Sequence, residues 1–445
     1  MKRFSSIRST LALAMPVAAS HVSDMVTHAA DSIMVGTLGA VPLAAVTLAG
    51  ASSIVVMLFG IGFSVAITPM AAAAWARGDA QSAAGIARSG TKISVLVSVV
   101  LVALLFAAQP LLAYIGAPSE VLEQTGPYYQ WLVASYALRF GFGAFKQTTE
   151  ALGNTRMPMI LALAANVLNV VLNWVFIYGN LGAQAMGAEG AGIATFLSRA
   201  AILVVAWVVW RRSTFFAPLR MYSAAKATAT EIRRLWVSGT EIGLQITLEV
   251  LGFAFGALLI SGMGAIPLAA HQIAINLASI TFMVALGLGT AGTILVSAAR
   301  GTGSASGVRT AVWSVLALVL VYELATATTF IALRAWLPTL YVDDAGVISL
   351  AAHLLVFAAA FQVFDGLQAA GMGLLRGLND TRIPTLISFF CYTVITMPTA
   401  YFLAYPCGLG ATGVWIGYLV GLFLASIGYL YRIRTLTTKK HKGLT

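Results

Sequence analysis

Apolar runs of about twenty residues follow one another along the whole chain and are separated by short polar segments, which is typical of helices that cross a bilayer. A transmembrane barrel would instead show alternating segments of about ten residues. The pattern therefore predicts an all-α integral membrane protein with twelve spans. We place these spans at residues 9–35, 44–74, 90–112, 128–150, 157–179, 190–210, 236–261, 268–299, 309–333, 350–375, 383–404 and 412–431.

One acid interrupts the apolar run that opens the stretch Thr247–Asn276. Glu249 lies in this run, which breaks at Gly262–Gly264 and Pro267 before a second apolar run begins. An ionised side chain at the bilayer centre costs roughly 2.5–3.5 kcal/mol on insertion scales. We therefore predict a function for Glu249, such as handling an ion or a cationic substrate. The structural alternative is a polar contact that locks two helices together.

The composition supports the membrane class and its charge indicates the topology. Hydrophobic residues make up 59% of the chain and charged residues 9%, whereas soluble domains hold about 25% charged residues. The net charge of +11 does not require a nucleic acid. With the N-terminus inside, most Lys and Arg residues fall on cytoplasmic segments, as membrane proteins prefer, and acids such as Glu120 and Asp343 fall on outer loops. We expect both termini in the cytoplasm, the lipid bilayer as a partner and no nucleic acid.

The N-terminal segment resembles a signal peptide, because a basic start precedes a short apolar core. Its apolar run continues to Val35 and contains Asp31. We therefore expect the segment to remain as the first span.

The sequence offers little support for an enzyme. It has no G-x-x-x-x-G-K-[ST] phosphate-binding loop, so we do not expect ATP to be the energy source. The five histidines are scattered, and no clustered nucleophile or metal site is visible. Cys391 and Cys407 lie at the two ends of one predicted helix, too far apart to bridge within it. We expect no enzymatic activity and no cofactor.

The two halves of the chain are related by an internal repeat. Gly39–Ala45 recurs as Gly264–Ala270, and Asn154–Pro158 recurs as Asp380–Pro384, at offsets of 225 and 226 residues. Six spans separate the copies, and six is even, so both halves have the same orientation in the membrane. Such a parallel repeat is typical of transporters whose binding site lies near the midplane.

The repeat predicts two pseudo-symmetric six-helix lobes that face each other across a midplane cavity. Alternating-access transporters commonly use this architecture. The expected division is an N-terminal lobe at 1–210, a basic cytoplasmic linker at 211–235 and a C-terminal lobe at 236–445 with a basic tail.

Several motifs, in this order and spacing, resemble the multidrug and toxic compound extrusion (MATE) transporters, most closely their NorM-like branch. They are Asp31–Gly36 in the first span, Leu248–Glu249 in the seventh, Ala269–Ala274 opening the eighth, and Phe364–Gln368, Leu375–Gly377 and Asp380–Thr381 at the end of the tenth. The resemblance covers essentially the whole chain. It departs from the family pattern at four charged positions, which are Asp24, His28, Arg139 and Glu241.

The resemblance implies a V-shaped pair of lobes and export of organic cations driven by inward movement of Na⁺ or H⁺. The functional acids of the family map here onto Asp31, Glu249 and Asp365. It also places the chain in the plasma membrane, as a multi-pass protein of the bacterial inner membrane. We expect it to act as a monomer.

Asp365 and Glu249 both belong to the second lobe and form one candidate ion site. Two carboxylates with further oxygen atoms are suitable ligands for Na⁺, and each raises the proton affinity of the other, so the pair suits Na⁺ or H⁺. Phe361 lies one turn before Asp365 on the same helical face, where it would attract an organic cation. The structural alternative for Phe361 is a lipid-facing or core position.

A second cluster lies in the first span, where Asp24, His28 and Asp31 share one helical face. A histidine between two acids can relay protons near neutral pH. In the bland alternative, His28 only neutralises one acid. By the repeat, Asp24 corresponds to Glu249, and Arg139 corresponds to Asp365. We therefore hypothesise that Arg139 pairs with Asp24 and neutralises it.

Other polar residues inside predicted spans are candidates for the substrate cavity or for contacts between helices. They are Asn166, Asn169 and Asn173 in the fifth span, Gln245 in the seventh, Gln272 and Asn276 in the eighth, and Gln368 in the tenth. Lys146 and Glu150 are expected to pair with each other. For Glu323, an interhelical role and a place on a proton path are equally plausible.

These observations favour a Na⁺- or H⁺-coupled antiporter that exports amphipathic, mostly cationic organic compounds. Related flippases of lipid-linked sugars share the two-lobe plan and are the alternative. Their phosphate-bearing substrates favour arginine and lysine, whereas the midplane here is mostly acidic, with Arg139 and Arg199 as exceptions.

Overall fold

The computed structural model describes residues 7–438, and every regular element within them is helical. The α-helices are α1 (Ile7–Gly36), α2 (Ala40–Val65), α3 (Ile67–Ala76), α4 (Ala80–Ala108), α5 (Ser119–Ala151), α6 (Arg156–Tyr178), α7 (Gly187–Arg212), α8 (Ala217–Met221), α9 (Ala229–Ser261), α10 (Ala265–Gly301), α11 (Ala305–Leu333), α12 (Ala345–Gly377), α13 (Arg382–Ser388), α14 (Met397–Ala404) and α15 (Gly410–Thr438). Between α13 and α14 runs a π-helix, η5 (Phe389–Thr396), and the other connections include the short 3₁₀ helices η1 (Gln109–Ile115), η2 (Asn180–Gly182), η3 (Thr214–Phe216) and η4 (Leu337–Leu340).

The all-helical class is confirmed, and the elements account for the predicted spans. Helices α2 and α3 together form one span, as do α13, η5 and α14, while α8 is a short extra helix. Within residues 7–438, 10 helical segments are long and apolar enough to cross a membrane. The long helices α1 and α5 are not among them. These two carry charged residues such as Asp24 and Asp31 on α1 and Arg139 on α5.

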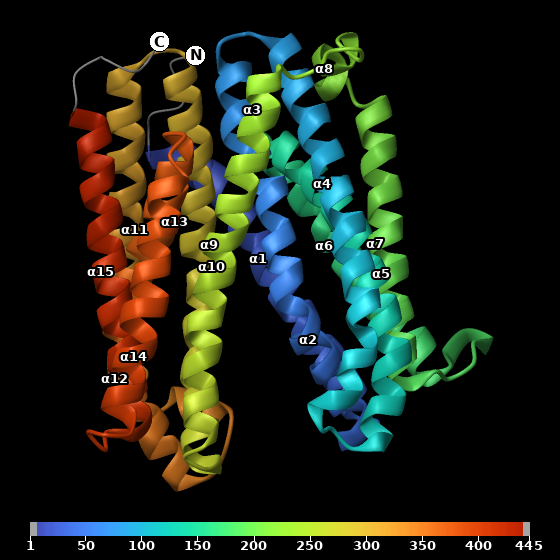
Figure 1. Ribbon diagram of the computed structural model, residues 1–445, viewed down its shortest axis with the longest axis vertical. Helices are drawn as coiled ribbons and strands as arrows, with labels where there is room; N and C mark the ends of the chain where they lie inside the picture. Colours follow the sequence, from blue (N-terminus) through green and yellow to red (C-terminus); the bar gives the residue numbers. More distant parts are fainter. Residues whose placement is uncertain (1–6, 439–445) are drawn as a thin grey trace. The chain divides into compact units, whose positions relative to one another are not determined.

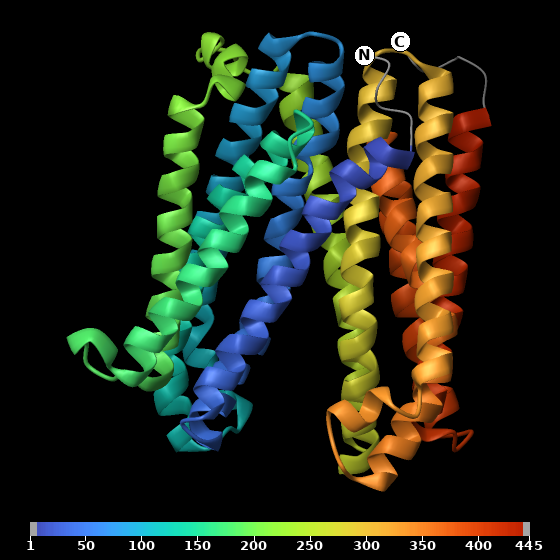
Figure 2. The same cartoon turned by 180° about the vertical axis from the view of Figure 1, so that it is seen from behind.

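The helices form two compact units. The first unit comprises residues 19–243, and the second comprises residues 244–438 together with residues 7–18. In the first unit α5 packs against α2, α4 and α7, and in the second unit α12 packs against α10, α11 and α15 (Figures 1 and 2). Helices α1 and α9 therefore each contribute to both units, because the division falls inside them.

The repeat extends to one close contact between helices in each unit. In the first unit, a Cβ on Gly62 of α2 would lie 2.5 Å from the Gly239 carbonyl oxygen and 2.2 Å from the Gly243 nitrogen of α9. In the second unit, a Cβ on Gly287 of α10 would lie 2.8 Å from the Ala14 carbonyl oxygen and 2.9 Å from the Ala18 nitrogen of α1. Positions 62 and 287, 14 and 239, and 18 and 243 all differ by 225. Small residues allow such close backbone approach in membranes.

We expect Gly62→Leu to reduce thermal stability strongly, because a side chain at this position meets backbone atoms that cannot turn away. Overpacking typically costs about 1–3 kcal/mol. The matched control is Gly50→Leu on the same helix, where a Cβ would have nothing within 4 Å. Thermal unfolding of the purified variants in detergent checks this, and equal stability of the two variants would contradict the packing described.

The two recurring sequence motifs have the same structural roles in both units. Gly39 and Gly264 precede α2 and α10 with φ angles of 122° and 112°, a backbone region that favours glycine. The Asn154 side chain accepts a hydrogen bond from the Met157 N–H at 3.0 Å, and Asp380 accepts one from the Ile383 N–H at 3.4 Å. Each side chain therefore caps the helix that follows.

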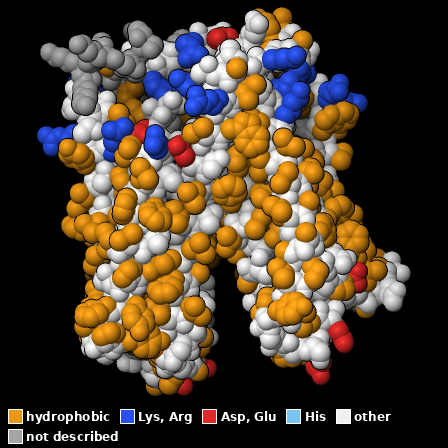
Figure 3. Space-filling view, in the orientation of Figure 1, with side chains coloured by type: hydrophobic (Ala, Val, Ile, Leu, Met, Phe, Trp, Pro, Cys, Tyr) orange, Lys and Arg blue, Asp and Glu red, His pale blue; other side chains and the backbone are white. Residues whose placement is uncertain are grey.

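In each unit the flanks are covered by hydrophobic side chains, and Lys and Arg side chains gather toward one end (Figure 3). Exposed apolar residues on these flanks include Val99, Leu104, Trp207, Leu258 and Val321. A soluble protein would bury most of such a surface. The protein is therefore a multi-pass membrane protein whose flanks face lipid.

Candidate functional site

Glu249 of α9 and Asp365 of α12 are electrostatic neighbours in the interior of the second unit. Their exposed fractions are 8% and 4%. The Oδ1 atom of Asp365 has no hydrogen-bond partner among residues 7–438. A buried carboxylate oxygen without a partner is costly, so this arrangement favours a proton or a cation at Asp365.

Two more oxygen atoms without partners lie close to this pair. The Gln368 side chain lies beside both Glu249 and Tyr392. Within the described part of the chain, neither Gln368 Oε1 nor the Tyr392 hydroxyl has a hydrogen-bond partner. Gly252 leaves room for the Tyr392 ring, because a Cβ there would lie 2.9 Å from Tyr392 Cδ1. Carboxylate, amide and phenol oxygens form a donor set that fits Na⁺ as well as a proton.

Tyr392 is carried by the π-helix η5 (Phe389–Thr396). π-Helical segments are rare and occur frequently at functional sites. Pro398 follows directly in α14 and lacks the N–H that a regular α-helix would bond to the carbonyl of Val394. Pro398 is therefore a local cause of the π-helical turns in η5.

A basic residue borders the acidic pair. Arg376 of α12 is an electrostatic neighbour of Glu249 and donates a hydrogen bond from Nη2 to Gln245 Oε1 at 3.0 Å. Gln245 in turn donates to the Tyr429 hydroxyl at 3.1 Å, and Ser388 Oγ lies 2.6 Å from the same hydroxyl. Gln245 therefore joins α9 to α12 and α15 and is not open to solvent.

Phe361 belongs to an aromatic cluster in the second unit. Its ring centroid lies 5.8 Å from that of Phe253 and 5.5 Å from that of Trp415, and only 2% of the residue is exposed. This agrees with the core position named as its structural alternative, and a direct contact with a cation stays a prediction. Gln272 and Asn276 are exposed on α10, and a role in substrate binding stays a prediction for both.

In the first unit, the asparagines of α6 bind the acids of α1. Asn166 Nδ2 donates to Asp24 Oδ1 at 3.2 Å and to Ser23 Oγ at 2.7 Å. Asn173 donates to Asp31 Oδ1 and, at 3.4 Å, to Asn169 Oδ1. These asparagines of α6 therefore connect α6 to α1 and donate hydrogen bonds to both candidate acids.

Asn169 extends this contact to α7 and is itself buried. Its Nδ2 donates to Thr195 Oγ1 at 3.4 Å. The three asparagines thus connect α1, α6 and α7. Whether they also contact a substrate stays a prediction.

In the described part of the chain, direct contacts are missing for two pairings that the sequence suggested, which are the histidine relay of the first span and the Arg139–Asp24 ion pair. Among the described residues, the His28 side chain forms no hydrogen bond with Asp24 or Asp31, and it is exposed. Arg139 is an electrostatic neighbour of Asp24, but the ion pairs found among residues 7–438 do not include it. Asp24 accepts one hydrogen bond, from Asn166, and Arg139 acts on it electrostatically without a direct ion pair, so the neutralisation of Asp24 by Arg139 stays a prediction.

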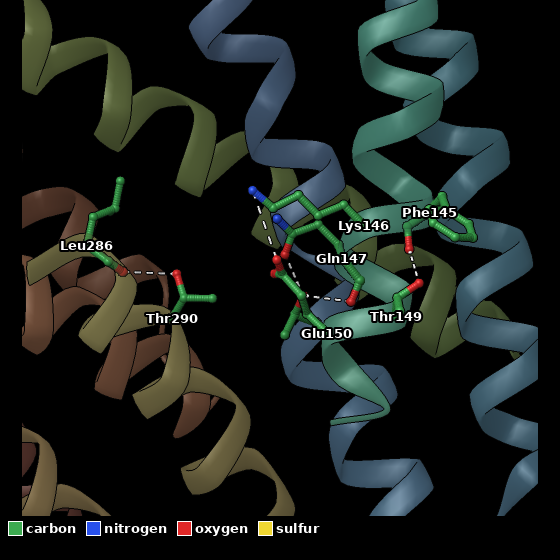
Figure 4. A network of polar contacts seen from close by, with 8 residues as sticks. Phe145, Lys146, Gln147, Thr149, Glu150, Leu286 and Thr290 are labelled. Carbon is green, nitrogen blue, oxygen red and sulfur yellow. Dashed lines mark hydrogen bonds and ion pairs between the residues drawn. The ribbon is translucent and has the colours of Figure 1, made fainter. Parts of the chain in front are cut away.

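The expected pair of Lys146 and Glu150 is confirmed. Lys146 Nζ lies 4.0 Å from Glu150 Oε1, one turn apart on α5 (Figure 4). Next to it, Gln147 accepts a hydrogen bond at its carbonyl oxygen from Thr68 at 3.1 Å. These contacts fix the end of α5 within the first unit.

Arg199 of α7 is a half-buried cation inside the first unit, and the sequence indicated it only as an exception to the acidic midplane. Its guanidinium donates to Ser135 and lies 5.8 Å from the centre of the Tyr136 ring. Tyr136 is held in turn by Ser53, whose hydroxyl lies 2.7 Å from the tyrosine hydroxyl. A cation–π contact of this kind stabilises a desolvated guanidinium.

The family model described as MatE matches the chain twice, at residues 16–175 and 242–402. The two matches coincide with the two repeats found in the sequence. The probable multidrug resistance protein NorM of Agrobacterium fabrum is 34% identical over 450 residues, which cover 99% of this chain and 96% of that protein. The multidrug resistance protein MdtK of Edwardsiella ictaluri is 32% identical, with 98% and 96% covered.

Solved structures agree at the level of the fold. The crystal structure of the eukaryotic MATE transporter AtDTX14 has a TM-score of 0.86 at 20% identity and covers 98% of each chain. An outward-facing multidrug resistance MATE family transporter has a TM-score of 0.86 at 22% identity, with 97% and 96% covered.

Proposed function

The chain belongs to the multidrug and toxic compound extrusion family, which consists of transporters and not enzymes, and from this premise we propose that it is a cation-coupled antiporter. It exports amphipathic, mostly cationic organic compounds in exchange for Na⁺ or H⁺. The names of the relatives as multidrug resistance proteins support the substrate class. We also propose that it works in the bacterial inner membrane with both termini in the cytoplasm.

The observation that carries the proposal is the buried acidic pair of the second unit. Glu249 and Asp365 lie beside oxygen atoms of Gln368 and Tyr392 that have no partner within residues 7–438. A bound Na⁺ or proton would supply the positive charge that these carboxylates need. Glu249, Asp365 and Gln368 are the residues that would hold it.

The same carboxylates attract a cationic substrate while they are ionised. Neutralising Asp365 removes this attraction, so binding of the coupling ion favours release of the substrate. Alternating access then couples the two movements, because a ligand shifts the equilibrium only by its different affinity for two states. In the first unit, Asp31 is the corresponding protonatable group, held by Asn173.

Everted membrane vesicles test the proposal, with ethidium as the fluorescent cation. We expect an imposed gradient of Na⁺ or of protons to drive ethidium accumulation above that of vesicles without the protein. ATP without a gradient should drive none. Applying the two gradients separately identifies the coupling ion, and ethidium accumulation that responds to neither gradient would refute the antiporter.

A further inference from the structure

Arg139 of α5 carries a guanidinium group without a direct partner in the described part of the chain. The residue is half-buried, and within residues 7–438 it forms no hydrogen bond and no ion pair. A guanidinium has five N–H donors in a planar fork that matches the two oxygen atoms of a carboxylate. Leaving such donors unpaired away from water is costly. Arg139 is therefore placed to bind an acceptor that the chain itself does not supply.

Arg199 of α7 reaches the same face of α5. Its guanidinium donates to Ser135 and lies 5.8 Å from the centre of the Tyr136 ring. Ser135 lies four residues before Arg139, and Tyr136 lies three residues before it, so these side chains share one face of the helix. Arg139 is accordingly an electrostatic neighbour of Arg199. The two cations approach the same stretch of α5, where an anion would relieve their repulsion.

Two acids of α1 face these cations, and neutral groups hold them. Asp24 and Asp31 each accept a hydrogen bond from an asparagine of α6. Arg139 is an electrostatic neighbour of Asp24, and Arg199 is one of Asp31. No ion pair among the described residues joins either acid to either arginine. Two positive and two negative charges therefore balance within the first unit without direct contact.

The asparagines of α6 link the acidic side of this site to the basic side. Asn173, which donates to Asp31, also donates to Asn169. Asn169 donates in turn to Thr195, which lies one helical turn before Arg199 on α7. Asn173 is fully buried, and its Oδ1 atom has no hydrogen-bond partner within residues 7–438. An unused acceptor next to a carboxylate favours an N–H donor from a ligand.

These charges favour a ligand that carries both signs. A simple cation beside the acids would leave the two arginines without an anion. Arginine pairs also bind phosphates, but the two nearby acids disfavour an anion with a double charge. A zwitterion with a carboxylate adds no net charge to a site that is already balanced, and it offers each half of the site a partner.

We propose that Arg139 and Arg199 form a carboxylate subsite in the first unit, through which the protein binds zwitterionic amphipathic compounds. Asp31 and the Oδ1 atom of Asn173 receive the N–H donors of the positive end of the same compound. This inference goes beyond the proposed function, and it rests on that function for the export of the bound compound.

Two dyes that differ by one methyl group test the inference in the purified protein. Rhodamine 110 has a free carboxylate and is a zwitterion, whereas rhodamine 123 is its methyl ester and a cation. Fluorescence anisotropy gives the affinity for each dye. In Arg139→Gln and in Arg199→Gln, the affinity for rhodamine 110 should fall about tenfold or more, because a charge-assisted hydrogen bond is lost. The affinity for rhodamine 123 should stay the same or rise, because a repelling charge is gone.

The ratio of the two affinities distinguishes a subsite from a structural role. A structural role would weaken the binding of both dyes alike and leave the ratio unchanged. Arg139→Lys keeps the positive charge and should restore part of the preference for rhodamine 110. Arg156→Gln, at an exposed arginine of α6, is the control and should keep the wild-type ratio. Asp31→Asn should weaken both dyes alike, because it removes a contact with the positive end that they share.

Potassium benzoate supplies a second measurement that needs no variant. Its carboxylate should compete with rhodamine 110 in the wild-type protein and leave the binding of rhodamine 123 unchanged, with potassium chloride at the same concentration as the control. An unchanged ratio in both glutamine variants, or an equal effect of benzoate on the two dyes, overturns the inference. Failure of the wild-type protein to bind rhodamine 123 or to transport ethidium would instead count against the proposed function.

Discussion

Glu249→Gln should abolish gradient-driven ethidium efflux while the protein remains folded and inserted. Glutamine is nearly isosteric and can still contact Gln368, but it carries no charge for a cation to neutralise. Losing a charge-assisted contact of about 2 kcal/mol corresponds to about 30-fold weaker binding of the cation. The coupling step fails in addition, because a neutral amide has no proton to release and no negative charge for Na⁺ to balance. Ethidium efflux from cells and from everted vesicles measures the effect.

Glu123→Gln is the matched control for this experiment. It makes the same chemical change at an exposed acid on α5, so it should keep wild-type efflux. Size-exclusion profiles and thermal unfolding of both variants should match the wild type. Unchanged efflux in a folded Glu249→Gln protein would show that the second unit does not carry the coupling ion through this residue.

The repeat was the most informative feature of the sequence. Its recurring residues meet local structural needs, which a single chain reveals. Gly39 and Gly264 recur because both corners need a positive φ angle. Asn154 and Asp380 recur because both cap a following helix. Features that depend on a few neighbouring residues are readable from one chain. The same holds for the Lys146–Glu150 pair, since its members are one helical turn apart.

Contacts between distant helices could not be predicted in this way. Asn166 and Asn173 are polar on one face of a helix, but nothing in the sequence says that they meet Asp24 and Asp31 on α1. Likewise, Asn166 was not foreseen as the hydrogen-bond partner of Asp24, and the neutralisation of Asp24 by Arg139 stays a prediction that their electrostatic proximity supports. The repeat gives corresponding positions in the two halves, and a position does not fix the partner of a long side chain.

The π-helix also could not be predicted from the hydrophobic pattern. Its residues, Phe389–Thr396, are as apolar as a regular span, so hydrophobic periodicity cannot distinguish a π-helix from an α-helix there. Only Pro398 gives a local signal, because it weakens the hydrogen-bond ladder. The consequence for the site is large, since η5 places the Tyr392 hydroxyl beside Gln368.

Arg376→Met should lower thermal stability more than any other single charge removal in the second unit. Arg376 is the electrostatic neighbour of Glu249 and donates to Gln245. Without it, the buried carboxylates of this unit lose their compensating cation. Hydrogen bonds to charged groups are typically worth about 1.5–3 kcal/mol, and we expect a loss in this range because Arg376 is half-buried and donates to Gln245. Thermal unfolding in detergent measures it.

The double variant Arg376→Met, Glu249→Gln separates charge compensation from packing. If charge is the cause, removing the Glu249 carboxylate should restore part of the stability that Arg376→Met loses. The coupling energy of such a cycle between neighbouring charges is about 0.5–3 kcal/mol. Arg309→Met, an exposed arginine on α11, is the control and should change stability little. Additive losses in the double variant would mean that Arg376 acts through Gln245 and Tyr429 alone, and that Glu249 is neutral in the resting protein.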